Sequence, residues 1–162
     1  MIYTKTSKAL SRISDKFRTK SIEKTYWAVV EKPPTQKKAT LRDFLKKNEK
    51  QNKSYVVGED ESGAKLAVLH YEWLLSSDRY HLIEVQLETG RHHQIRAQLA
   101  HMGCIIKGDL KYGARRSNKD ASIHLHSRAA SFDHPVSDGQ VRITAACPED
   151  PIWQFFEQQL AG

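Results

Sequence analysis

The stretch "LETGRHHQIRAQLAHMGCIIKGDLKYG", Leu87 to Gly113, predicts three elements in direct succession: the end of a strand, a helix and a glycine-punctuated loop. Apolar residues recur in it at i, i+4 and i+7, a spacing typical of a helix that buries one face. The helix is predicted over 91–102 and is ended by Gly103, a residue type favoured just after a helix. Its buried stripe consists of Ile95, Leu99 and Met102.

Strands dominate the chain on both sides of this helix. The run 80–88 alternates apolar with polar residues, as a half-buried strand does, and we expect it to pair antiparallel with the long run 65–77. Aromatic and β-branched residues predict three further strands, at 24–32, 123–132 and 141–147.

Three further helices are predicted, each from a capping residue and an apolar pattern. They are the helix 7–17, opened by a serine and burying Leu10, Ile13 and Phe17; the helix 40–48, with Thr40 as its cap; and the helix 150–160, with Asp150 as its cap and Pro151 at its first position. This order of elements predicts a mixed α+β domain, with a mainly antiparallel sheet and flanking helices.

Length and composition indicate one soluble domain. The chain has 162 residues, and its 26 Lys and Arg against 19 Asp and Glu give a formal charge of +7. Such a surplus fits a polyanionic partner, although a solubilising basic surface explains it equally well. Cys104 and Cys147 fit neither a disulfide framework nor a C-x-x-C site. Because no apolar run approaches the roughly 20 residues that span a bilayer, we expect a cytoplasmic protein without a membrane partner.

Histidines near the predicted helix raise the question of a metal site. His92, His93 and His101 lie close in sequence, and a second group follows later, formed by His124, His126 and His134. Zinc ligands on a helix usually lie one turn apart, whereas His93 and His101 are two turns apart. We therefore predict no metal and interpret these residues as separate surface or hydrogen-bonding histidines.

The start of the helix offers a second kind of site. Its first backbone N–H groups lack intrahelical partners, so "TGRHH" combines donors, a positive dipole end and the guanidinium of Arg91. We interpret this as a phosphate site, and a purely structural turn at Gly90 is the alternative. Arg96, beside the apolar stripe, needs a carboxylate or a phosphate as partner, which leaves an anion site and an ordinary salt bridge open.

Taken together, the motifs resemble those of the RluA-type pseudouridine synthases. "ETGRHHQIRAQLAHMGCIIKGDLKYG" followed by "IHLHSRAASFDHP" is similar to the family wording G-R-T-H-Q-I-R, G-D-x-x-Y-G, L-H-A and F-x-H-P. "YTKTSKALSRISDKFRTKSIEKTYWAVV" is similar to the family stretch that ends in its K-x-Y motif. His92 stands where the family has threonine. The resemblance covers nearly the whole chain, as a single domain over 1–162.

The resemblance implies an enzyme that isomerises uridine to pseudouridine in ribosomal or transfer RNA without a cofactor, on a nucleotide flipped out of its stack. It implies that Tyr26 stacks on the base, that Leu125 lies beneath it, and that Arg96 pairs with the catalytic aspartate. The residues expected to bind RNA are Arg91, His92, His93, Lys107, Arg115 and Arg116.

One family motif is missing from the sequence. The catalytic aspartate of the family lies in an H-R-L-D motif, which this chain lacks. Five other aspartates stand at family positions that are not catalytic: Asp15, Asp43, Asp109, Asp133 and Asp138. We therefore expect an N-terminally truncated catalytic domain, inactive alone, in which an exposed strand edge near Ile2 favours association. A non-catalytic RNA-binding module of the same fold is the alternative.

Overall fold

A computed structural model describes residues 3–18, 22–134, 137 and 139–162. Its strands form one sheet in the order β3-β2-β4-β5-β1-β6-β7, and every pairing between them is antiparallel. The strands are β1 (Glu23–Val30), β2 (Lys38–Asn48), β3 (Lys53–Val57), β4 (Lys65–Ser76), β5 (His81–Leu87), β6 (Leu125–Asp133) and β7 (Gln140–Thr144).

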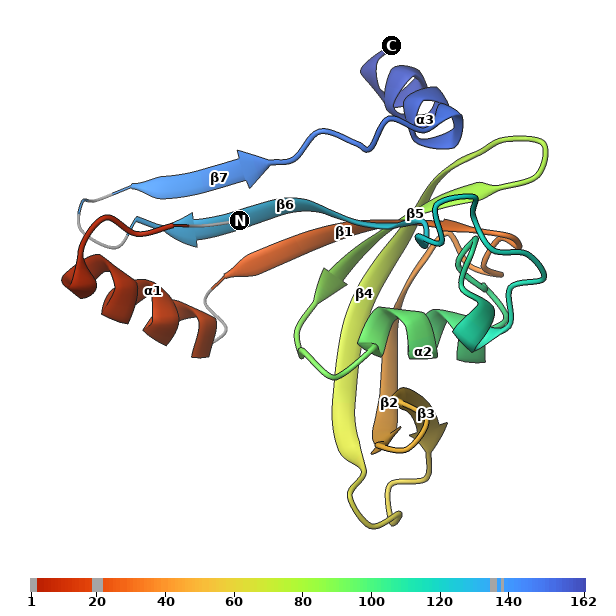
Figure 1. Cartoon of the computed structure of the whole chain (residues 1–162), viewed down its shortest axis with the longest axis horizontal. Coiled ribbons are helices and arrows are strands. Elements are labelled where there is room, and N and C mark those ends of the chain that lie inside the picture. The colour runs from red at the N-terminus through yellow and green to blue at the C-terminus, as the bar shows by residue number, and fades with distance from the viewer. Residues whose placement is uncertain (1–2, 19–21, 135–136, 138) are drawn as a thin grey trace.

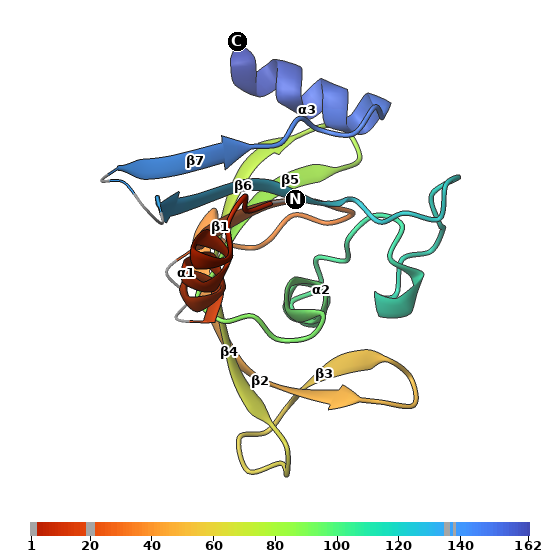
Figure 2. The same cartoon turned by 60° about the vertical axis from the view of Figure 1, so that its left-hand side comes forward.

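The helices lie on different parts of this sheet (Figure 1). They are α1 (Ser7–Arg18), α2 (Gln94–His101), the 3-10 helix η1 (Leu110–Tyr112) and α3 (Pro151–Ala161). Figure 2 shows α2 lying within the curve of the sheet, between the β2–β3 hairpin and the loop that leads to β6. Both the hairpin and the loop can therefore reach the start of α2.

The two faces of the sheet are covered by different helices. On one face, Ala28, Val30, Ile83 and Val85 pack with the apolar stripe of α2 in a buried cluster. On the other face, Trp153 and Phe156 of α3 cover Trp27, Val29 and Leu82. Neighbouring residues of β1 therefore face opposite helices, and this alternation explains why the strand reads as an unbroken apolar run.

Most of the predicted architecture is confirmed. The fold is α+β, the runs 65–77 and 80–88 pair as β4 and β5, and the strands predicted at 24–32, 123–132 and 141–147 correspond to β1, β6 and β7. The cap of α3 is confirmed as well, because the Asp150 carboxylate accepts hydrogen bonds from the backbone N–H groups of Ile152 and Trp153.

The helix predicted over 40–48 is wrong, because these residues form most of β2. Side chains of β2 alternate in burial, and Leu45 reaches the core beneath α2. Asp43 interrupts the apolar side of this alternation, where its carboxylate accepts a hydrogen bond of 2.7 Å from the Nε2 of Gln98. A polar pair in which Gln98 is buried and Asp43 partly buried therefore stands where the strand pattern requires an apolar residue.

The first helix differs from its prediction in two details. Its cap is Thr6 rather than Ser7, because the Thr6 Oγ1 accepts from the N–H of Ala9 at 3.2 Å. Leu10 is 55% exposed, whereas Ile13 packs against Phe132 as expected of the apolar stripe. The predicted strand edge near Ile2 lies outside the described residues, as does Asp138.

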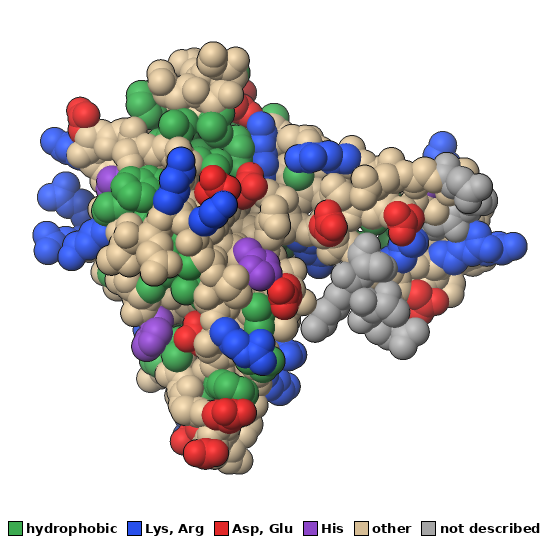
Figure 3. Space-filling model, turned by 180° about the vertical axis from the view of Figure 1, so that it is seen from behind, with side chains coloured by type: hydrophobic (Ala, Val, Ile, Leu, Met, Phe, Trp, Pro, Cys, Tyr) green, Lys and Arg blue, Asp and Glu red, His purple; other side chains and the backbone are tan. Residues whose placement is uncertain are grey.

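The surface carries charges of both signs. Figure 3 shows acidic and basic side chains interspersed over the rear of the molecule, with basic ones gathered at the end opposite the arm of β6, β7 and α1. Within the described part of the chain, no helix combines the length and the apolar character that crossing a membrane requires.

Candidate functional site

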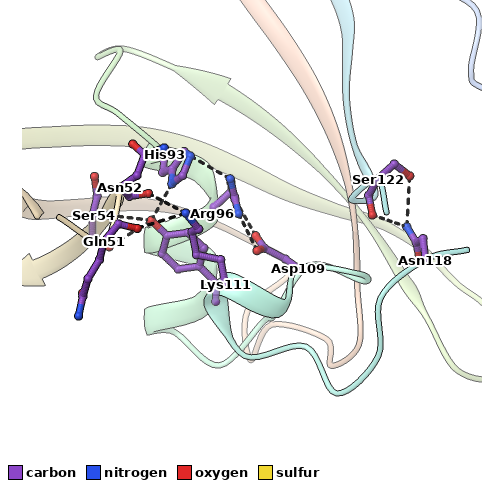
Figure 4. A network of polar contacts seen from close by, with 10 residues as sticks. Gln51, Asn52, Ser54, His93, Arg96, Asp109, Lys111, Asn118 and Ser122 are labelled. Carbon is purple, nitrogen blue, oxygen red and sulfur yellow. Dashed lines mark hydrogen bonds and ion pairs between the residues drawn. The ribbon is translucent and has the colours of Figure 1, made fainter. Parts of the chain in front are cut away.

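Arg96 lies at the centre of a polar network on the side of α2 that faces η1 (Figure 4). Its Nε and Nη2 donate to the two carboxylate oxygens of Asp109, both at 2.7 Å. The Asp109 side chain is 1% exposed and the Arg96 side chain 18%. This bidentate pair is buried on the carboxylate side, so Asp109 depends on Arg96 for compensation of its charge.

Of the two partners left open for Arg96, the structure shows the salt bridge, and the carboxylate is Asp109 of the glycine-punctuated loop. Asp109 follows Gly108 in the glycine-punctuated loop, where that glycine has a φ of 84° and touches the Asn118 side chain closely. A Cβ at this position would lie 2.7 Å from the Asn118 Nδ2. Only glycine combines this positive φ with the absence of a Cβ, and Gly108 thus allows the loop to turn Asp109 towards α2.

His93 orients the same guanidinium from another side. Its Nε2 lies 2.9 Å from the Arg96 Nη1, and its Nδ1 lies 3.2 Å from the Tyr112 hydroxyl. Since arginine can only donate, the Nε2 of His93 accepts and its Nδ1 carries the proton. The Tyr112 hydroxyl then accepts from His93 and from the Ser54 N–H, and it donates to the Ser54 carbonyl oxygen. Both ring nitrogens of His93 and the hydroxyl proton of Tyr112 therefore have partners when His93 is neutral.

The β2–β3 hairpin closes this network. Ser54 in β3 donates its hydroxyl proton to the carbonyl oxygen of His92 at 2.7 Å. The Lys111 Nζ donates to the carbonyl oxygens of Gln51 and Asn52 in the hairpin turn. Together with Tyr112, these contacts fasten the hairpin to η1, so the hairpin, η1 and the start of α2 together fix the surroundings of Arg96.

Both histidines of this network are biased towards the neutral form. Burial, with Arg96 and His92 nearby, lowers the pKa of His93 from 6.5 to about 4. Burial and the charge of Lys47 lower the pKa of His92 below its usual value. The two rings stack with centroids 3.9 Å apart, and His93 meets the Tyr112 ring edge-on. A proton on either ring would therefore face neighbouring positive charge.

Tyr26 and Leu125 lie on neighbouring strands of the face that α2 covers. In the register of β1 and β6, Tyr26 is opposite Ser127 and Ala28 is opposite Leu125. Both predicted site residues are half-buried and pack against the cluster that contains Ile95, the residue before Arg96. Burial raises the pKa of Tyr26, against a hydrogen bond with Ser127 that lowers it, so its phenol stays protonated at neutral pH.

Lys107 and Leu125 both line a cavity of about 750 Å³ between the 117–126 segment and the start of α3. Asn118 organises this segment, because its Oδ1 accepts from Lys107 and its Nδ2 bonds to His124. His124 is buried, stacks on Trp153 and contacts the Asp150 carboxylate through its Nε2. Burial lowers the pKa of His124, although the bond to Asp150 opposes this.

The other residues predicted to bind RNA lie apart from this cavity. Arg91 donates from its Nε to the Leu66 carbonyl oxygen at 2.8 Å, and its backbone N–H donates to the Gln94 side chain. These bonds occupy part of the donor set that we assigned to a phosphate. Arg115 and Arg116 are exposed and make no hydrogen bond or ion pair with a described residue. The structure thus separates the predicted set into three places.

The histidines do not gather as metal ligands do. Among the described residues, no three His, Cys, Asp or Glu side chains lie close enough together to hold a metal ion. His92 and His93 stack face to face, and His101 is exposed at the far end of α2.

Sequence reasoning missed three members of the Arg96 network. Asp109 and Tyr112 both belong to the G-D-x-x-Y-G wording, and their spacing of three places them together on one turn of η1. That spacing was a usable signal. Ser54 carries no such signal, because its role depends on the pairing of β2 with β3, which the predicted helix at 40–48 excluded.

The domain therefore holds an arginine–carboxylate pair where a helix, a loop and a hairpin meet. Comparison with known families identifies it: residues 1–101 match the family described as RNA pseudouridylate synthase, and the chain belongs to this family.

Similar proteins agree with this assignment. An uncharacterized RNA pseudouridine synthase of Bacillus subtilis is 31% identical over 150 residues, which are 93% of this chain and 48% of that protein. The ribosomal large subunit pseudouridine synthase D of Zymomonas mobilis is 28% identical, over 93% of this chain and 49% of its own length. The chain thus spans about half the length of these curated relatives.

A solved structure shares the fold. The human RNA pseudouridylate synthase domain containing 4 superposes with a TM-score of 0.74 at 21% identity, covering 95% of this chain and 69% of its own.

Proposed function

We propose that this chain forms part of an RNA pseudouridine synthase, which isomerises uridine to pseudouridine in ribosomal or transfer RNA in the cytoplasm. The observation that carries the proposal is the family match over residues 1–101, together with an arginine fixed bidentately at the motif position. The reaction breaks the bond from C1′ to N1 of the target uridine, turns the uracil and rejoins it through C5. The target nucleotide must leave its stack for these atoms to be reached.

Three residues take the parts that the resemblance assigns. Tyr26 stacks on the flipped uracil from β1, and Leu125 supports the base from β6. Arg96 supplies positive charge beside the reacting sugar. Its Nε and one proton of Nη2 are held by Asp109 and one Nη1 proton by His93, which leaves one N–H on each terminal nitrogen for substrate or for a further carboxylate.

The printed sequence contains no H-R-L-D motif, and we propose that it does not make pseudouridine by itself. Asp109 is the one fully buried aspartate among the described residues, and both of its oxygens are bound to Arg96. A carboxylate held in this way is screened from a substrate. Tyr26 and Arg96 cannot replace it, because a phenol with a raised pKa is protonated and a guanidinium is always cationic.

The test is pseudouridine mapping on unmodified ribosomal and transfer RNA. Carbodiimide adducts stop primer extension at pseudouridine, and we expect no new stops with the 162-residue chain. A chain extended upstream by a segment that carries H-R-L-D should produce them, and Arg96→Lys in that longer chain should abolish most of them.

New stops with the printed chain would overturn the proposed inactivity. Absence of stops in the extended chain, with RNA binding retained, would instead favour the alternative, a non-catalytic RNA-binding module of the same fold.

A further inference from the structure

His92 presents an acceptor that the described residues leave unused. The Ser54 hydroxyl has a single proton, and it donates that proton to the carbonyl oxygen of His92. The contact of 2.9 Å between the Ser54 Oγ and the His92 Nδ1 must therefore be a bond donated by His92. With the proton on Nδ1, the Nε2 of the neutral ring carries a lone pair, and no described residue donates to it.

The ring that carries this lone pair is fixed in place. Ser54 holds both the Nδ1 and the backbone carbonyl of His92, and His93 stacks on one face of the ring at 3.9 Å. His93 is itself bonded to Arg96 and Tyr112. The acceptor is thus oriented before any ligand arrives, which lowers the entropic cost of using it. The side chain remains partly exposed.

Lys47, Arg96 and Lys111 place positive charge near this ring. Glu49 opposes them in part, because its carboxylate pairs with Lys47 at 2.6 Å, so the remaining positive charge fits a nucleic-acid backbone as ligand. Lys47 lies opposite Ser54 in the pairing of β2 with β3, and Lys111 is tied to the hairpin turn by two backbone carbonyls. An ammonium has three donors, so Lys111 keeps one of them for a phosphate. Among the groups that accompany every phosphate of RNA, the ribose 2′-hydroxyl is the donor that a neutral imidazole can accept, and DNA lacks it.

We propose that the Nε2 of His92 accepts a hydrogen bond from a ribose 2′-hydroxyl of bound RNA, so that this side chain distinguishes RNA from DNA beside the Arg96 network. The inference rests on the proposed function for the presence of RNA. It concerns a residue at which this chain departs from the family wording, which has threonine there.

The experiment measures the affinity of the chain for two probes by fluorescence anisotropy. One probe is a short RNA hairpin with a uridine-rich loop, and the other is the same hairpin with 2′-deoxyuridines in the loop. We expect the wild type to bind the all-ribose probe about 3- to 10-fold more tightly, the range of one neutral hydrogen bond. His92→Phe keeps a flat ring for the stack on His93 but has no acceptor, so its ratio should fall close to one.

Two controls make the result decisive. His101→Phe removes an exposed histidine at the other end of α2 and should keep the wild-type ratio. His92→Asn restores a short acceptor and should recover part of the ratio if the fold is intact.

Equal ratios in the wild type and His92→Phe would overturn the inference while leaving RNA binding, and with it the proposed function, in place. Failure of the wild type to bind either probe would overturn both.

Discussion

At the scale of single residues, the Arg96–Asp109 pair has a structural role beside the catalytic one that we propose for Arg96. Asp109 is 1% exposed, so an unpaired charge there cannot be hydrated. We predict that Arg96→Met lowers the free energy of unfolding by about 3 kcal/mol, since breaking a buried pair from one side leaves the other charge uncompensated. Urea denaturation followed by tryptophan fluorescence would measure the loss. Arg115→Met, at an exposed arginine, is the matched control and should change stability little.

A double variant separates the charge from the loss of packing. Arg96→Met combined with Asp109→Leu removes both charges, and we expect it to be more stable than Arg96→Met alone. If Arg96→Met and Arg115→Met cost the same, the pair is not a source of stability.

His93 should make stability depend on pH. Its pKa falls from 6.5 to about 4 on folding, because of burial and then Arg96, so the folded state binds fewer protons than the unfolded state in this window. Stability should therefore be full above pH 6.5 and decrease as the pH falls towards 4. Because His93 is partly exposed, solvent screening reduces the expected loss of stability to about 1 to 2 kcal/mol.

His92 and His124 also have lowered pKa values, and burial is the first cause for each, so the wild-type slope contains their contributions. The informative quantity is the difference between the wild type and His93→Asn, measured as urea midpoints at pH 7 and pH 4.5. The variant should lose less stability between these pH values. Parallel profiles would show that His93 does not carry the effect.

At the scale of secondary structure, the outcome of prediction depended on whether a pattern was local. The α3 helix was predictable because its cap, its proline and its apolar positions all lie within a few consecutive residues. The strand β2 was not predictable, because Asp43 interrupts its alternation of polar and apolar residues. The partner of Asp43 is Gln98, which lies 55 residues away in the sequence. For the same reason the sequence placed Tyr26 and Arg96 on their elements but could not show that Asp109 and Ser54 lie beside them.

The N-cap of α3 should contribute more to the free energy of unfolding than an ordinary N-cap does. The Asp150 carboxylate accepts two backbone N–H groups and also contacts His124. We predict that Asp150→Ala lowers stability by about 1 to 2 kcal/mol and the helical circular dichroism slightly. Glu149→Ala removes an exposed neighbouring acid and should have little effect in the same thermal melts. Equal melting temperatures for the two variants would contradict this role of Asp150.

The β2–β3 hairpin should loosen when its link to η1 is removed. The Tyr112 hydroxyl accepts from the buried backbone N–H of Ser54 at 2.9 Å. Tyr112→Phe leaves this donor without its partner, at a cost of about 1 to 3 kcal/mol. Amide hydrogen exchange should accelerate at Ser54 more than in β5. Tyr80→Phe, on a tyrosine between β4 and β5 whose hydroxyl bonds to no described residue, serves as the control. Unchanged protection at Ser54 would show that the hairpin holds without Tyr112.

At the scale of the whole molecule, the formal charge of +7 predicts a salt-dependent affinity for the RNA that we propose as the substrate. Each phosphate that a lysine or arginine neutralises releases counterions, so the logarithm of the affinity should fall linearly with the logarithm of the salt concentration, by about 0.7 to 0.9 per contact. Arg115 and Arg116 are exposed, without ion pairs to described residues, on the loop between η1 and β6. They can turn to a phosphate without first breaking an internal bond.

Arg116→Gln should therefore weaken binding at low salt and reduce the slope by about 0.7 to 0.9, the value of one contact. Arg142→Gln makes the same change of charge on β7, the strand at the end of the sheet farthest from β3, and should leave the slope nearly unchanged. Equal losses of affinity in the two variants would mean that RNA binding depends on the net charge of the chain rather than on the loop. A wild-type affinity that does not change with salt would exclude binding through phosphate contacts. A slope change confined to Arg116→Gln would place the phosphate path along the loop between η1 and β6, because Arg116 directly precedes Ser117, the first residue of this loop that lines the same cavity as Lys107.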